Sequence, residues 1–113
     1  MDVIQTPPIL VVPGGVLRDE DIRRCTGLAA LEAGRRLEAQ GRVSRLLTHE
    51  SGDGIESEVR SDFRRPYTQN VMLRRNTQGD LAIAGLCTCR VGLNCEHIAA
   101  VLLAARQRFG LEP

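Results

Sequence analysis

The chain has 113 residues, 26% of them charged and 42% hydrophobic, and its formal net charge at pH 7 is +1. A chain of this length buries roughly 60–70% of its unfolded surface, which is enough for one modest core. The nearly neutral charge makes long-range attraction to nucleic acid weak, and no apolar run approaches the roughly 20 residues of a membrane helix.

The first 17 residues are predicted to form an extended arm, because prolines and glycines interrupt them (Pro7, Pro8, Pro13, Gly14 and Gly15). Its apolar residues 9–12 could add one short strand. The acidic start and the short apolar run are unlike a secretory signal peptide, so we expect a cytoplasmic protein.

A helical region is expected next, at residues 19–40, because three acidic residues open it and favour a helix N-terminus. Gly27 should divide this region into a short helix and a longer one. Gly41 suits the C-terminal cap of the longer helix.

Four strands are then expected, at residues 42–48, 54–60, 67–74 and 81–86. Turn-forming residues between them indicate hairpins. Ile55 and Val59 alternate with Glu56 and Glu58, which is the pattern of a strand with one buried face. We therefore predict an α+β fold, an antiparallel β-meander of about four strands flanked by helices.

The most informative pattern is CTCRVGLNCEH at residues 87–97, which has the spacing C-x-C-x5-C-x-H. Its candidate ligands are Cys87, Cys89, Cys95 and His97. Zinc prefers four tetrahedral ligands, and three thiolates with one imidazole fill that shell and leave no position for water. We therefore predict one structural Zn²⁺, held between the last strand and the C-terminal helix.

The spacing also predicts where that helix begins. Cys87 and Cys89 project to the same side of an extended segment. Residues two apart in a helix are separated by about 200°, so Cys95 and His97 can share a metal only if Cys95 stands at or before the first helical residue. Asn94 is a good residue type for the N-terminal cap.

The apolar face of this helix should pack against the last strand. Its members are Ile98, Val101, Leu102, Ala105 and Phe109. Leu81 and Ile83 share the strand parity of Cys87, so we expect them to lie under the helix.

Disulfide bonds are the alternative use of the four cysteines, because an even number is typical of a secreted disulfide framework. The absence of a secretion signal and the nearby histidine favour the metal. Cys25 is not needed by a filled shell, so a buried helix position is favoured over a metal or redox role. His49 is expected to be an exposed turn residue.

The segment CTCRVGLNCEHIAAVLLA resembles the SWIM zinc finger, whose pattern is C-x-C, a short variable loop, and C-x-H opening a helix of small and apolar residues. Upstream, GRRLEAQGRV and RPYTQNVML are similar to the N-terminal region of bacterial Swi/Snf-family helicase-like ATPases. The chain departs from the finger pattern at Arg90, where proline often stands, and at Glu96, where a basic residue often stands. We place the finger at residues 81–107, in one compact domain with residues 18–80, followed by a tail at residues 108–113.

The resemblance implies a noncatalytic zinc-binding module that recognises nucleic acid or a protein partner for a Swi/Snf-like ATPase, with no small-molecule substrate and no membrane. The alternatives are a free-standing protein adaptor and a zinc or thiol enzyme. Glu96 is a poor candidate for a general base, because a saturated zinc activates no water. The chain lacks a G-x-x-x-x-G-K-[ST] loop, so ATPase activity would lie outside these residues.

Charge is uneven along the chain, since residues 46–59 carry −4 and residues 60–75 carry +4. The candidate nucleic-acid or partner-binding residues in the second segment are Arg60, Arg64, Arg65, Arg74 and Arg75. Arginine suits bidentate phosphate contact, although aromatic stacking platforms are scarce here. DNA, RNA and an acidic protein stay open as ligands, as do nucleoid association and the oligomeric state.

Overall fold

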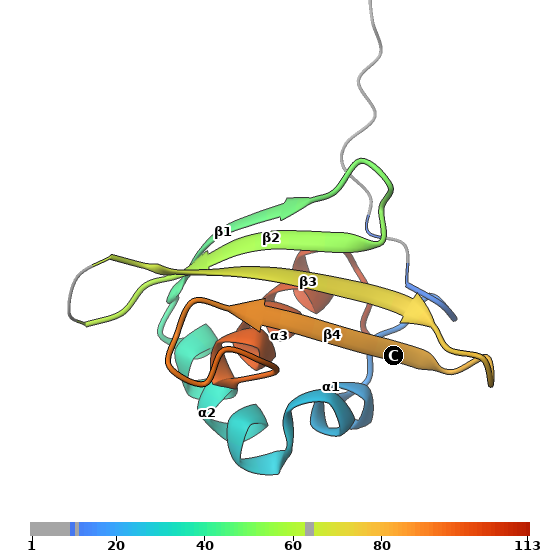
Figure 1. Cartoon of the computed structure of the whole chain (residues 1–113), viewed down its shortest axis with the longest axis horizontal. Coiled ribbons are helices and arrows are strands. Elements are labelled where there is room, and N and C mark those ends of the chain that lie inside the picture. The colour runs from blue at the N-terminus through green and yellow to red at the C-terminus, as the bar shows by residue number, and fades with distance from the viewer. Residues whose placement is uncertain (1–9, 11, 63–64) are drawn as a thin grey trace, which may run out of the picture.

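The computed structural model describes residue 10, residues 12–62 and residues 65–113. Its helices and strands follow the predicted order (Figure 1). They are α1 (Asp19–Thr26), α2 (Leu28–Ala39), β1 (Val43–Thr48), β2 (Gly54–Val59), β3 (Tyr67–Arg75), β4 (Leu81–Cys87) and α3 (Glu96–Arg108).

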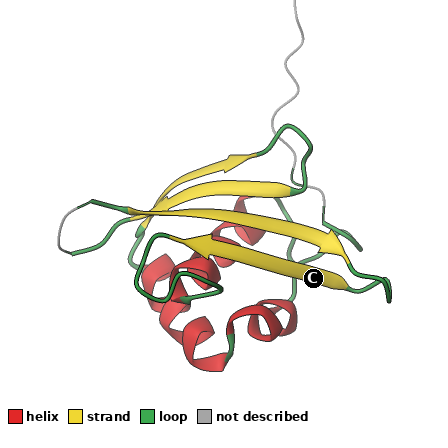
Figure 2. Ribbon diagram, in the orientation of Figure 1, coloured by secondary structure: helices red, strands yellow, loops and turns green. Residues whose placement is uncertain are grey.

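The four strands form one sheet in the order β1-β2-β3-β4, and every neighbouring pair is antiparallel. The helices lie on one side of this sheet (Figure 2). The predicted α+β class, with an antiparallel four-stranded meander, is confirmed. We call the side of the sheet away from the helices the open face.

The core lies between the sheet and α3. The predicted alternation in β2 is confirmed, because Ile55 and Val59 are fully buried while Glu56 points outward and is exposed. On the helix, all four of the positions Ile98, Val101, Leu102 and Ala105 are fully buried. The aliphatic side chains therefore form one layer of contact that fixes α3 against the strands.

Glycines allow the closest approaches to α3. A Cβ atom added to Gly34 of α2 would lie 2.7 Å from the Cβ of Ala99, and one added to Gly85 of β4 would lie 2.6 Å from Cγ2 of Ile98. Ile98 thus occupies the space over Gly85, the inward position two residues beyond Ile83. Leu81 and Ile83 are half-buried and pack against the same core.

Glycine also sets the helix boundaries. Gly27 separates α1 from α2 with a φ of 90°, as predicted. α2 ends at Ala39, Gln40 is its C-terminal cap, and Gly41 follows with a φ of 69°. The amide of Arg42 then donates to the carbonyl of Leu37 over 3.0 Å, which completes a Schellman-type ending.

An ionic contact fixes the C-terminal end of α3. Asp19 at the start of α1 accepts from Arg35 of α2 over 2.7 Å and from Arg106 of α3 over 2.5 Å. The Arg106 hydrogen bond, followed by that of Arg35, lowers the pKa of the Asp19 carboxyl. One carboxylate therefore joins all three helices.

The predicted strand at residues 9–12 includes Ile9 and Val11, which lie outside the described residues. Leu10 and Val12 are buried in the core. The amide of Leu17 donates to the carbonyl of Leu111 over 2.8 Å, so the segment before α1 lies beside the segment after α3. Among the described residues, no helix is long and apolar enough to cross a membrane.

Candidate metal centre

The four predicted ligands come from the junction of β4 and α3. Cys87 is the last residue of β4, Cys89 follows in the loop, Cys95 is the N-cap of α3, and His97 lies in its first turn. Their ligand atoms all lie within 4.8 Å of one another. The requirement that Cys95 stand at or before the first helical residue is met.

Distances within the cluster suit a tetrahedral metal. Nδ1 of His97 lies 3.5 Å from Sγ of Cys95 and 3.7 Å from Sγ of Cys87. In a tetrahedral shell, zinc–sulfur distances of about 2.3 Å and zinc–nitrogen distances of about 2.0–2.1 Å place a sulfur and a nitrogen ligand roughly 3.5–3.6 Å apart. The cluster therefore fits one zinc ion, with a shell closed by four protein ligands.

The loop at residues 88–94 folds back onto the end of β4. The Cys87 amide donates to the carbonyl of Gly92, and the Asn94 amide donates to the carbonyl of Gly85, each over 2.8 Å. Leu86 and Leu93 face each other in an isolated antiparallel bridge. These contacts bring Cys95 back to Cys87.

The prediction that Asn94 caps α3 is wrong. Asn94 has a φ of 46°, and its Oδ1 accepts a hydrogen bond from the amide of Gly85 over 2.8 Å. Its side chain therefore bonds to the strand, while Cys95 takes the cap position in an extended conformation. A thiolate at this helix N-terminus is favoured by the partial positive charge there.

The thiols and the imidazole are strongly coupled. The hydrogen bond from Cys95 lowers the pKa of the Cys87 thiol far below its ordinary value, and His97 and Gln69 act in the same direction. The same contact raises the pKa of the Cys95 thiol, and a separate hydrogen bond with Cys87 raises the pKa of His97. Cys87 therefore ionises first, and binding of Zn²⁺ must displace protons from the other groups.

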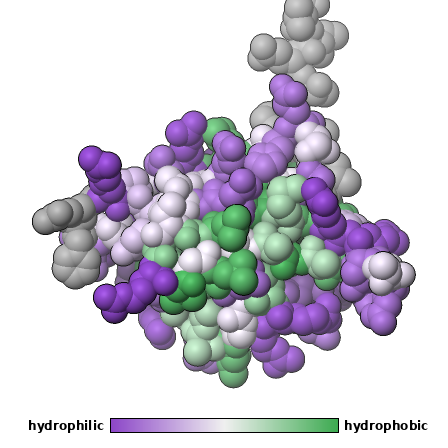
Figure 3. Space-filling model, in the orientation of Figure 1, coloured by the Kyte–Doolittle hydropathy of each residue, from purple (hydrophilic) through white to green (hydrophobic). Residues whose placement is uncertain are grey.

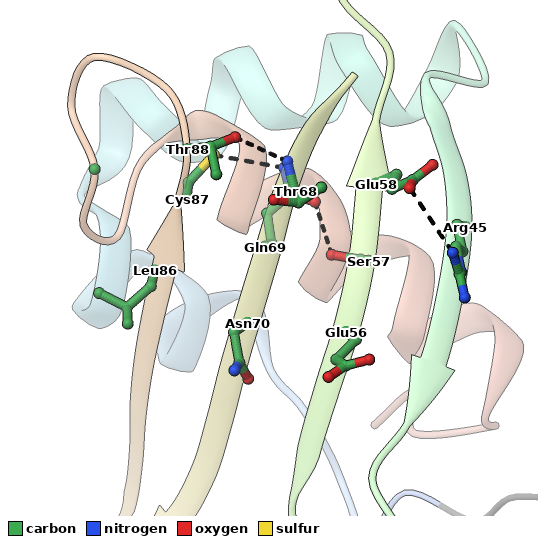
Figure 4. A pocket seen from close by; sticks show the side chains of 11 residues that line it. Arg45, Glu56, Ser57, Glu58, Thr68, Gln69, Asn70, Leu86, Cys87 and Thr88 are labelled. Atoms are coloured by element: carbon green, nitrogen blue, oxygen red, sulfur yellow. Dashed lines mark hydrogen bonds and ion pairs between the residues drawn. The ribbon is translucent and has the colours of Figure 1, made fainter. Parts of the chain in front are cut away.

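Two buried polar residues on the neighbouring strands, Gln69 and Ser57, form a polar row that leads to Cys87. Nε2 of Gln69 on β3 lies 3.4 Å from Sγ of Cys87 and donates to the carbonyl of Tyr67 over 3.0 Å. Oε1 of Gln69 accepts from the hydroxyl of Ser57 on β2 over 2.7 Å (Figure 4). Ser57 and Gln69 are each only 4% exposed. The row fixes the orientation of the amide so that its N–H points at the sulfur.

Sequence reasoning missed Gln69 and Ser57. Both are polar residues at inward positions of strands whose other inward residues, such as Ile55 and Val71, are apolar. That break in the alternation was the available signal. Tyr67 is a further neighbour, with its ring centroid 4.7 Å from that of His97 at an interplanar angle of 46°.

Three large aliphatic side chains are exposed at the end of β4 and in the finger loop. Leu86, Val91 and Leu93 are 62%, 71% and 54% exposed, and we call them the finger patch. In Figure 3, hydrophobic surface gathers in the middle of the molecule and hydrophilic surface lies toward both ends. Arg90 is exposed in the same loop.

A hollow of about 400 Å³ lies beside the finger patch (Figure 4). Residues from all four strands and from the finger loop line it: Arg45, Glu56, Ser57, Glu58, Thr68, Gln69, Asn70, Leu86, Cys87, Thr88 and Gly92. Its volume is at the low end of the roughly 300–1,000 Å³ of ligand pockets. The hollow joins the polar row behind Cys87 to the open face of the sheet.

The predicted arginine edge does not form one surface. Arg60 and Arg65 belong to the β2–β3 connection, whereas Arg74 and Arg75 end β3. A rise of about 3.3 Å per residue puts the two ends of this strand roughly 26 Å apart. Arg64 lies outside the described residues. Sequence proximity suggested one edge, but the length of β3 separates the arginines into two groups.

Cys25 and His49 are the two remaining titratable candidates. Sγ of Cys25 donates to the carbonyl of Ile83 over 3.5 Å, and burial raises the pKa of its thiol to about 11. The ring of His49 packs against Gly54, and its Nε2 lies 3.9 Å from Oε1 of Glu56. Both residues lie apart from the cysteine cluster. Cys25 is partly buried on α1. The prediction that His49 is an exposed turn residue is wrong, because the residue is half-buried and its Nε2 is buried with no hydrogen-bond partner among the described residues.

Comparison with known families agrees with this geometry. Residues 84–106 match the family model of the SWIM zinc finger, and this range includes all four residues of the cluster. No curated protein and no solved structure matches the chain. The chain is thus similar to SWIM zinc fingers over the second half of β4, the finger loop and most of α3, and it is a zinc-binding module with one structural zinc ion.

Proposed function

We propose that this chain is a noncatalytic interaction module in which a structural zinc presents the finger patch to a protein partner. The observation that carries the proposal is the exposure of Leu86 and Leu93, which face each other in a β-bridge, together with exposed Val91 in the loop between them. Exposed apolar residues that gather in one place mark interaction sites more often than single ones do.

The finger patch is held rigidly. The Cys87–Gly92 and Asn94–Gly85 hydrogen bonds fix the loop on both sides of its tip. The zinc ligands flank the same loop. A surface that is already ordered loses little conformational entropy when a partner covers it. Zinc therefore contributes to binding indirectly, because it keeps the apolar side chains in place.

A noncatalytic role is supported by the donor set. Catalytic zinc keeps one position open for water, whereas structural zinc has four protein ligands. Cys87, Cys89, Cys95 and His97 supply four ligand atoms in one cluster. Glu96 is exposed beside His97, but a closed shell gives it no activated water to deprotonate.

The partner that we propose is a helicase-like ATPase similar to the bacterial Swi/Snf family, in the same or another polypeptide. Support comes from the two upstream resemblances, which lie on α2 with the start of β1 and on β3. These segments frame the finger, since α2 packs on α3 through Gly34 and β3 pairs with β4. The proposal therefore includes the whole described domain.

Site-specific photo-crosslinking in cells tests this function. A benzoylphenylalanine at Val91 should crosslink to a protein, and the same residue at exposed Glu32 on α2 should not. Mass spectrometry of the product should identify a polypeptide with an ATP-binding loop. Equal crosslinking from both positions, or crosslinking from Val91 to nucleic acid alone, would contradict the proposal.

Nucleic acid is the second candidate, supported by the exposed arginines at both ends of β3. Arg65 and Arg75 are exposed, and neither forms an ion pair with another described residue. Phosphate contact needs such free guanidinium groups. The acidic open face between the two groups weakens this candidate, because Glu56 and Glu58 would repel a phosphate backbone that crossed it.

A further inference from the structure

The open face of the sheet combines acidic and apolar side chains in one row. Glu56 lies opposite Leu47 on β1 and Asn70 on β3, and Asn70 lies opposite Leu86 on β4. Across all four strands the row reads leucine, glutamate, asparagine, leucine. Glu58 projects from the same face two residues further along β2 and lines the same hollow (Figure 4).

Both carboxylates keep the capacity to accept hydrogen bonds. The side chain of Glu56 is 64% exposed, and its Oε1 lies 3.9 Å from Nε2 of His49. Oε1 of Glu58 lies 3.9 Å from Nη1 of Arg45. These separations exceed normal hydrogen-bond length, so neither carboxylate is saturated. Arg45 is the one cation among the residues that line the hollow, and it offsets one of two negative charges.

Leu86 of the finger patch forms an apolar wall of this acidic hollow. Leu86 belongs to both, and its bridge to Leu93 carries the apolar surface over the finger loop. A ligand that filled the hollow and covered this wall would need a cationic group close to an aliphatic or aromatic one. Such a ligand would meet charge with charge and cover the exposed leucines.

We propose that this surface binds a segment of a partner protein in which Lys or Arg stands next to an aliphatic or aromatic residue, with the cation over Glu56 and Glu58 and the apolar group on Leu86 and Leu93. The inference rests on the proposed protein-binding function and adds the chemistry of the partner. Charge complementarity selects a basic segment over nucleic acid, because phosphates would be repelled by the two glutamates. The rigid finger patch supplies the affinity, and the carboxylates supply the specificity.

A random dodecapeptide display library, selected on the purified zinc-bound protein, tests the inference. Enriched peptides should carry Lys or Arg adjacent to a large apolar residue. A fluorescent peptide from this set should bind the Glu56→Gln/Glu58→Gln variant roughly two- to tenfold more weakly, as expected for exposed charge pairs. The matched control is Glu32→Gln/Glu112→Gln, which removes the same charge away from the hollow and should leave affinity unchanged. Zinc content must stay the same in both variants.

A second pair of variants separates this inference from the function on which it rests. Leu86→Ser/Leu93→Ser should abolish peptide binding while zinc stays bound. If that loss occurs but the enriched peptides lack basic residues or ignore the glutamate variant, the basic partner is ruled out and the protein-binding function stands. If no peptide is enriched, or the leucine variant binds normally, both proposals fail. Binding of a 20-nucleotide single strand by the wild type that Leu86→Ser/Leu93→Ser abolishes would instead identify nucleic acid as the occupant and overturn the inference.

Discussion

Gln69 directs its amide N–H at the sulfur of Cys87 from 3.4 Å away, and the two residues are register partners on β3 and β4. Ser57 is in turn the register partner of Gln69 on β2. Three inward-facing residues on adjacent strands thus form one polar row that ends at a zinc ligand. A hydrogen bond to a thiolate stabilises the charged form that the metal needs.

The polar row predicts a metal-affinity defect. Gln69→Leu should weaken zinc binding about 10- to 100-fold, the usual effect of losing a partner of a metal ligand. Competition with a chromophoric chelator measures the affinity, and the sulfur-to-metal charge-transfer band of the Co²⁺ form should shift. Gln78→Leu, in the exposed β3–β4 turn, is the control. An unchanged affinity and an unchanged band would show that Gln69 only fills space.

The ligand assignment predicts which cysteines zinc needs. Cys87→Ser/Cys95→Ser should lose the metal and unfold the finger, because an incomplete shell forfeits binding energy that is also folding energy. Cys25→Ala should keep one zinc per chain, since its thiol bonds to the Ile83 carbonyl. Elemental analysis of the purified proteins decides both cases. Full zinc occupancy in the double variant would refute the assignment.

The coupled thiols predict a pH dependence of zinc binding. The raised pKa values of Cys95 and His97 keep both groups protonated to higher pH in the metal-free protein. Zinc needs them deprotonated, so affinity should rise with pH and fall as pH drops through the raised pKa of His97. Titration calorimetry in buffers of different ionisation enthalpy should detect protons released at neutral pH. Zero proton release at neutral pH would contradict the predicted coupling.

The contact between α2 and α3 predicts that Gly34→Ala is destabilising. Its Cβ would lie 2.7 Å from the Cβ of Ala99 and 2.8 Å from the backbone nitrogen of Ala100. Alanine gains about 1 kcal/mol of helix propensity, but overpacking costs about 1–3 kcal/mol, so we expect a net loss of unfolding free energy. Urea denaturation of the zinc-saturated protein measures it. An increase in the unfolding free energy would show that α2 and α3 can move apart to accommodate the added Cβ.

The arginine groups predict how any nucleic-acid binding would depend on salt. Reversing charge at Arg65 or at Arg75 should weaken binding separately, because the two groups lie at opposite ends of β3. The log–log slope of affinity against salt should be about −0.7 to −0.9 per phosphate neutralised. Fluorescence anisotropy with labelled DNA and RNA at low ionic strength is the measurement. Binding that both reversals leave intact would exclude these arginines.

Much of the fold was accessible from sequence because local patterns specify it. The alternation around Ile55 and Val59 predicted β2 to within one residue, and the backbone freedom of Gly27 predicted the break between two helices. The spacing of Cys95 and His97 required the start of α3 at the site. These features depend on neighbours a few residues away, which a single sequence displays directly.

The remaining features of the site could not be predicted, because they depend on strand register and on competition between alternative hydrogen bonds. Gln69 meets Cys87 only because the β2–β3 and β3–β4 connections set the pairing of three strands. Asn94 had two possible roles, and its side chain bonds to Gly85 because the finger loop returns to β4. The arginines were grouped by position in the chain, although nine-residue β3 separates Arg60 and Arg65 from Arg74 and Arg75.

The Asp19–Arg106 contact determines which end of α3 unfolds first when zinc is removed. α3 is fastened at its first turn by the metal and near its last turn by Arg106, whose partner Asp19 also holds α2 through Arg35. Removing zinc frees only the first turn of α3. The helix should then fray from Glu96 forward while its far end stays docked, so amide exchange would quicken at Ala99 well before it does at Phe109.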